Sequence, residues 1–144
     1  MKAKSIKGKS TEEIRTALEE AMADDYKPTV AIVFISIKQN RKAVTELLYK
    51  KGIDILGATS CGEFINGHQS EGETVIMLLD LSKENFAILF EEIGERRISD
   101  TAAQLAGNAL QIFKNPSMIV CSTGMSSKGE YFDGPSMVKK KKKT

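Results

Sequence analysis

The residues best suited to chemistry lie in one short run, Gly-Ala-Thr-Ser-Cys-Gly-Glu from position 57 to position 63. Glycine lets the backbone approach a bound group closely, and short polar side chains leave neighbouring amides open. Because the run directly follows an apolar, strand-like segment, and ligands are usually held in loops at strand ends, we expect a binding site here. The expected contributors are Gly57, Thr59, Ser60, Cys61, Gly62 and Glu63.

A second polar run begins at Cys121, directly after another apolar segment. It matches neither the Walker A spacing nor the dinucleotide-binding glycine pattern. Its hydroxyl groups, open amides and lysine could hold a carboxylate or a similar anion, and the alternative is a polar loop without a ligand. If the strands before the two runs are parallel neighbours, both runs meet at one edge of the sheet. The expected contributors here are Ser122, Thr123, Gly124 and Lys128.

The first run also contains two candidate nucleophiles, Ser60 and Cys61. Ser60 nearly fits the nucleophile-elbow pattern, but Ala58 replaces its first glycine, and the elbow needs a following helix where residues 64–72 resemble a loop. Cys61 is a possible nucleophile, because His68 lies seven residues later and could activate a thiol. No third orienting group is identifiable. A cysteine-dependent enzyme therefore stays the alternative to a binding protein, and we name no catalytic residue.

Two further features bear on the chemistry, the carboxyl group of Glu63 and the small number of possible metal ligands. Glu63 could bind an amine or act as a general base, but we expect a solvated turn residue. The chain has two cysteines and one histidine, which is too few for an ordinary zinc site. We expect no metal and no cofactor.

The segments that must position these residues alternate between strand and helix patterns. Ser10 and Glu13 have the spacing of a capping box, Asn40 can cap a second helix, and Gly52 can end it. The sequence predicts an α/β fold with a mixed sheet and packed helices. The expected order is strand 1–7, helix 10–24, strand 29–36, helix 40–51, strand 53–59, a β-hairpin of 74–81 with 86–93, helix 100–113 and strand 117–121.

Length and ending predict one domain with an unusual end. The 144 residues suit a single compact domain, expected here over residues 1–138. Asp133-Gly134-Pro135 has the composition of a helix start, but Lys139–Lys143 follow almost at once. We therefore expect a domain cut short after Val138 and a disordered lysine-rich tail at residues 139–144.

Charge and hydropathy exclude two classes of partner. Without Lys139–Lys143, 16 basic residues face 19 acidic ones, so the body of the chain has a net charge of −3, which disfavours nucleic-acid binding. No apolar run approaches the ~20 residues that cross a bilayer. With two cysteines and no leader-like segment, we expect a cytoplasmic protein, and a homo-oligomer is possible.

The chain resembles the FIST family in three segments. These are the run from Gly57 to Glu63, the preceding strand Val30–Ile35, and the segment from Ser122-Thr123-Gly124 to Asp133-Gly134. The resemblance covers residues 1 to about 138 and corresponds to the front part of the amino-terminal FIST domain; the rest of that domain and the carboxy-terminal FIST domain are not in this sequence. It implies an intracellular sensory domain that recognises a small ligand such as an amino acid and is linked to signal-transduction modules. It brings no catalytic residue. A protein-interaction module is the third alternative.

Overall fold

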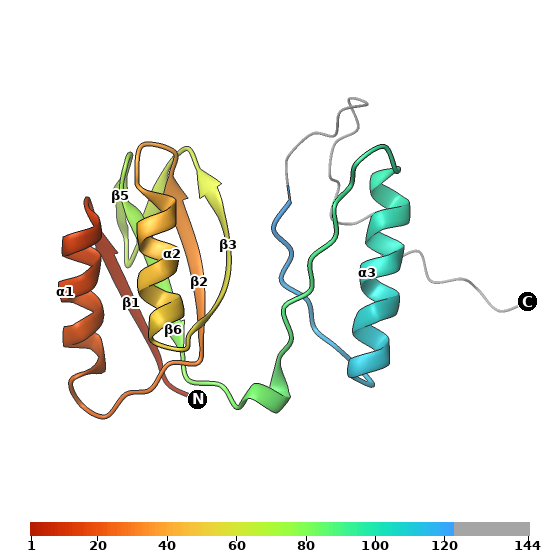
Figure 1. The fold of residues 1–144 in the computed structure, drawn as a ribbon, viewed down its shortest axis with the longest axis horizontal. Helices are drawn as coiled ribbons and strands as arrows, with labels where there is room; N and C mark the ends of the chain where they lie inside the picture. The colour runs from red at the N-terminus through yellow and green to blue at the C-terminus, as the bar shows by residue number, and fades with distance from the viewer. Residues whose placement is uncertain (123–144) are drawn as a thin grey trace, which may run out of the picture. The chain divides into compact units, whose positions relative to one another are not determined.

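The computed structural model describes residues 1–122, which fall into two compact units (Figure 1). Unit 1 comprises residues 1–88, and unit 2 begins at Leu89. The α/β class expected from the sequence is confirmed. The expected boundary at Val138, the lysine-rich tail and the helix start at Asp133 lie outside the described residues.

Unit 1 is built on a four-stranded mixed sheet in the order β1-β6-β2-β3. Strands β2 and β3 are parallel, whereas β6 runs antiparallel to both β1 and β2. Two strand–helix–strand units lead from β1 to β2 and from β2 to β3 in the same direction across the sheet. Right-handed connections then place both helices on one face, as Figure 1 shows. The elements are β1 (Ala3–Gly8), α1 (Thr11–Met22), β2 (Val30–Ser36), α2 (Arg41–Lys50), β3 (Asp54–Ser60) and β6 (Thr74–Leu79).

Both helices of unit 1 begin at the caps expected from the sequence. The Ser10 side chain accepts a hydrogen bond from the Glu13 amide, and Glu13 in turn accepts one from the Lys9 amide. The Asn40 side chain accepts from the Ala43 amide. After α2 the backbone turns at Gly52, where φ is +73°. Satisfying the free amides of a first turn fixes where each helix starts.

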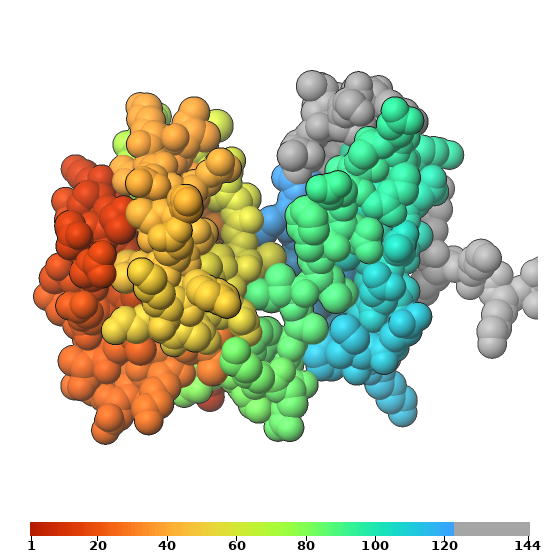
Figure 2. Space-filling model, in the orientation of Figure 1, coloured from red at the N-terminus to blue at the C-terminus, as the bar shows by residue number. Residues whose placement is uncertain are grey.

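The core of unit 1 lies between this sheet face and the two helices, which cover it in the space-filling view (Figure 2). Alternate residues of β2 and β6 point toward the helices, as the period of a strand requires. Each fully buried aliphatic side chain contributes about 1.5–3 kcal/mol relative to an exposed one. The central contacts come from Ala31, Val33, Ile35, Ile76 and Leu78 of the sheet and from Ile14, Leu18, Val44 and Leu48 of the helices.

Residues 64–72, expected to form a loop, contain a small hairpin instead. Strands β4 (Glu63–Ile65) and β5 (His68–Ser70) pair antiparallel. The two residues between them, Asn66 and Gly67, both have positive φ angles, of 49° and 79°. This is the backbone of the tight turn that Asn-Gly favours, so the local sequence did carry the signal.

The expected hairpin of residues 74–81 with residues 86–93 is wrong. Residues 74–79 form β6, which lies between β1 and β2, so both edges of this strand are already paired. A strand has only two edges and cannot accept a third partner. The chain continues instead into a short 3-10 helix, Lys83–Asn85, and residues 86–93 form no strand.

Unit 2 contains one described helix, α3 (Ile98–Ile112), close to the expected helix 100–113. The expected strand 117–121 is wrong, since these residues form no strand and none of the described residues pairs with them. An isolated extended segment leaves its backbone groups without strand partners, which makes it unstable as a strand. Among the helices of residues 1–122, none has the length and apolar character needed to cross a membrane.

Gly57 in β3 provides a test of this packing. A methyl group added there would lie 2.1 Å from the carbonyl oxygen of Val33 on β2, and a backbone atom cannot rotate away. We expect Gly57→Ala to lower the free energy of unfolding, measured with urea, by at least about 1–3 kcal/mol. In the control Gly62→Ala the nearest atom is 3.8 Å away, so a change within about 0.5 kcal/mol is expected. Equal losses in the two variants would contradict this reading of the β2–β3 contact.

Candidate functional site

The first predicted run lies at the end of one strand and the start of the next. Gly57, Thr59 and Ser60 belong to the second half of β3, Cys61 and Gly62 form the following turn, and Glu63 begins β4. The carboxyl end of β3 lies beside the carboxyl end of its parallel neighbour β2. This part of the expected geometry, a polar run at a strand end, is therefore confirmed.

Glu63 is buried, with only 1% of its surface exposed, so the expected solvated turn residue is wrong. One carboxyl oxygen accepts a hydrogen bond from the Ser60 hydroxyl at 2.6 Å. The other accepts from the backbone amides of Gly72 and Glu73 at 3.0 and 3.1 Å. All three partners donate, which suits the acceptor-only character of an ionised carboxylate. Glu63 thus joins the end of β3 to the start of β6.

A second buried carboxyl group, that of Glu73, lies at the base of the same hairpin. It accepts a hydrogen bond from the Ser70 hydroxyl at 2.7 Å, and Lys9 Nζ and His68 Nε2 lie 3.8 and 3.6 Å from its oxygens. The Ser70 hydrogen bond, followed by the positive charges of Lys7, His68 and Lys9, lowers the pKa of Glu73, although burial opposes this shift. The sole histidine therefore faces a carboxyl group.

Gln39 holds the β2–α2 loop against two other loops. Its amide nitrogen donates to the carbonyl oxygens of Lys9 at 2.8 Å and Gly72 at 2.6 Å. The amide of Ser36, at the end of β2, donates to the carbonyl oxygen of Glu73. Gln39 lies outside both predicted runs, and no local pattern marks it, because its partners are 30 and 33 residues away.

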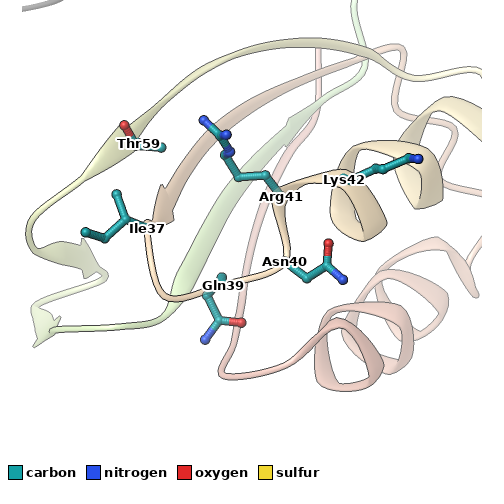
Figure 3. A pocket seen from close by; sticks show the side chains of 6 residues that line it. All are labelled: Ile37, Gln39, Asn40, Arg41, Lys42 and Thr59. Atoms are coloured by element: carbon teal, nitrogen blue, oxygen red, sulfur yellow. The ribbon is translucent and has the colours of Figure 1, made fainter.

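An open pocket of about 420 Å³ lies beside this loop. It is lined by Thr59 of β3 and by residues at the start of α2 and in the loop before it, namely Ile37, Gln39, Asn40, Arg41 and Lys42. In Figure 3, Arg41 extends from the start of α2 toward Thr59, whereas Gln39, Asn40 and Lys42 point away from that space. Only Thr59 of the lining residues was predicted as a site residue.

The charge of this pocket is positive. Among residues 1–122, no carboxylate forms an ion pair with Arg41, and Lys42 pairs only with the exposed Glu46 at 3.9 Å. The amino-terminal end of α2 adds the partial positive charge of a helix start. The side chains of Gln39 and Asn40 are already engaged in structural hydrogen bonds. The arrangement can therefore accommodate an anionic group beside Arg41 and Thr59.

The second predicted run falls largely outside this description. Ser122 is the last described residue and belongs to unit 2, whereas Thr123, Gly124 and Lys128 lie outside the described residues. The expected strand that should bring this run to the sheet edge does not form. The joint site of the two runs stays a prediction.

Cys61 is a free, exposed thiol. No described residue forms a hydrogen bond with it, and the imidazole of His68 is turned to Glu73. In residues 1–122, no group of histidine, cysteine, aspartate and glutamate side chains is placed to hold a metal ion. The cysteine-dependent enzyme stays the alternative prediction.

The shifted carboxyl group of Glu73 predicts how stability depends on pH. Because its pKa in the folded protein lies below the ordinary value of 4.5, its stabilising effect is present above about pH 4.5 and is lost as the pH falls through the folded pKa. We expect Ser70→Ala, which removes the main cause, to lower the free energy of unfolding at pH 7 and to lose this difference from the wild type in acid. Urea unfolding between pH 7 and pH 3 measures it.

Ser82→Ala is the matched control, since Ser82 donates to the exposed Glu84. Its effect should be small and independent of pH. A Ser70→Ala loss of stability that is the same in acid as at neutral pH would contradict the assignment.

A comparison with models of protein families identifies the family to which this chain belongs. The FIST N domain model matches residues 29–134 of the 144-residue chain, from the start of β2 to beyond the described residues. The comparisons with curated proteins and with solved structures found no match. FIST N domains are a family of sensory domains in signal transduction. The matched region includes the pocket, the Glu63 turn and both predicted runs, and this chain belongs to the FIST N domain family.

Proposed function

We propose that unit 1 binds a small ligand with a carboxylate group, an amino acid in the first instance, in the pocket between Arg41 and Thr59. The observation that carries this proposal is the Arg41 guanidinium, which extends into an open pocket without a carboxylate partner in the described part of the chain. Arginine binds carboxylates through two parallel, charge-assisted hydrogen bonds. The sensory role of the family is consistent with the binding of a ligand.

The residues around Arg41 would contact two different parts of the ligand, its carboxylate and its apolar part. Its carboxylate would lie at the start of α2, where the helix dipole and Arg41 act together. Its apolar part would contact Ile37, which is 79% exposed. Because the pocket is open to solvent, the ion pair is screened, and we expect modest affinity unless further residues close over the ligand.

The other predicted contributors complete the proposal. Gly57, Ser60, Cys61 and Gly62 would line the strand end beside the ligand, and the contribution of Ser122, Thr123, Gly124 and Lys128 stays a prediction. The oxygens of Glu63 are engaged with Ser60, Gly72 and Glu73, so contact with a ligand amine requires the Ser60 bond to open. Such an exchange would link ligand binding to the position of the hairpin.

The proposed role is binding rather than catalysis, in an intracellular signalling protein. Cys61 is accessible, but the only imidazole of the chain pairs with Glu73, which leaves no identified base beside the thiol. The bound state would be passed to a partner domain through the elements that Gln39 joins, the loops after β1 and β2 and the turn before β6.

A panel of amino acids tested on the complete chain checks the proposal. A ligand present at 100 times its dissociation constant should add about 2.7 kcal/mol of stability, seen as a rise in melting temperature. We expect Arg41→Ala to abolish this rise. Arg15→Ala, which removes an exposed arginine of α1 that pairs with Glu12, should leave it unchanged.

One outcome of this experiment would contradict the proposed function, and another would contradict only the proposed site. A full panel without any rise would count against amino-acid sensing. A rise that Arg41→Ala retains would place the ligand elsewhere on the protein.

A further inference from the structure

The two edges of the unit 1 sheet differ in their protection. An exposed edge strand can pair with another chain, and proteins commonly prevent this with lysine or proline on the edge. The β1 edge carries Lys4 and Lys7, with Lys2 directly before it. The β3 edge carries one charged residue at its start, Asp54, which pairs with Lys83, and no charged residue or proline follows from Ile55 to Gly62. This absence of protection indicates an edge that is normally covered.

The backbone of β3 presents a regular row of free groups on this edge. The Asp54 amide donates to the Thr29 carbonyl oxygen, on the side of β2. Since hydrogen-bonding directions alternate along a strand, the amides and carbonyl groups of Ile55, Gly57 and Thr59 point to the other side. No strand within residues 1–122 pairs with them.

We propose that β3 pairs antiparallel with β3 of a second copy of this chain, about a two-fold axis at Gly57. In this register Gly57 faces Gly57, and Ile55 faces Thr59, so all the outward groups of these residues meet acceptors and donors. The same surface serves both copies, as closed two-fold symmetry requires. The pairing continues the sheet from one copy into the other.

The side chains of β3 complement one another in this register. Leu56 of one copy lies opposite Ala58 of the other, so a large side chain meets a small one, and the β-branched Ile55 meets the β-branched Thr59. Asp54 lies opposite the hydroxyl-bearing Ser60 and meets no like charge. This fit of β3 to itself favours a second copy over an unrelated strand.

The sheet face away from the helices supports the same occupant. Phe34 pairs with Ala58 in register and is 41% exposed, because Ala58 beside it is too small to cover the ring. Leu56 of the second copy would lie directly beyond Ala58 on this face, within reach of a ring of that size. Pairing would therefore bury aromatic surface that β3 alone leaves open.

Size-exclusion chromatography with light scattering on the complete chain is the first test. We expect concentration-dependent dimers. Thr59→Lys, which places a lysine on the exposed edge, should give monomers, whereas Ser5→Lys on the opposite edge strand should still dimerise. Melting temperatures of both variants confirm folding. A wild type that stays monomeric, or equal loss of dimer in both variants, would overturn the proposal.

Disulfide trapping tests the register itself, in a background where Cys61 and Cys121 are replaced by serine. Opposite residues of a non-hydrogen-bonded antiparallel pair have Cα atoms about 4.5 Å apart, a distance that a disulfide spans. A mixture of Leu56→Cys chains and Ala58→Cys chains should therefore form cross-linked dimers, and neither variant alone should do so. Failure of the mixture to cross-link would overturn the Gly57 register.

Hydrogen exchange provides a readout that needs no substitution. The amides of Ile55, Gly57 and Thr59 should become protected as the protein concentration rises. Protection that is already complete in the monomer would show that another segment of the chain covers this edge, and would also overturn the proposal.

Discussion

The buried carboxyl group of Glu63 is the interaction on which the candidate site depends. Burying such a group without partners costs several kcal/mol, and only full hydrogen bonding makes it tolerable. Here the Ser60 hydroxyl and the amides of Gly72 and Glu73 supply the donors. These bonds close the segment between β3 and β6 into a loop of fixed geometry, so the hairpin β4–β5 and the end of β3 share one anchor.

That anchor positions one side of the pocket, and Gln39 positions the other. Glu63 holds the end of β3, where Thr59 lies, while Gln39 fastens the β2–α2 loop to Lys9 and Gly72. The amides that donate to Glu63 belong to Gly72 and Glu73, and the carbonyl oxygen that accepts from Gln39 belongs to Gly72, so all of these groups lie in the turn before β6. One backbone turn therefore sets the distance between the strand end and the start of α2, and Arg41 supplies the positive charge between them.

Local patterns in the sequence predicted the local parts of this structure. The caps at Ser10 and Asn40 and the strand–helix alternation up to Ser60 depend on neighbouring residues, and each is confirmed. The Asn66-Gly67 turn is an equally local signal of a hairpin, and the loop expected at residues 64–72 overlooks it. The pairing of β6 could not be read in the same way, because its partners β1 and β2 lie far away in the sequence. The burial of Glu63 has a different cause: its partners Ser60, Gly72 and Glu73 lie 3 to 10 residues away, and the hairpin that returns Gly72 and Glu73 to it was expected to be a loop. The pocket at Arg41 depends on Thr59 of the neighbouring strand, which no local pattern around Arg41 reveals.

The most direct test of this account is the stability of Glu63→Gln relative to Glu71→Gln, measured by urea unfolding. The substitution at position 63 puts an amide donor among groups that all donate, whereas Glu71 is exposed and makes no such contacts. We expect Glu63→Gln to lose about 1.5–3 kcal/mol of unfolding free energy and Glu71→Gln to change by less than about 0.5 kcal/mol. Equal, small changes in the two variants would contradict the central role of the buried carboxyl group.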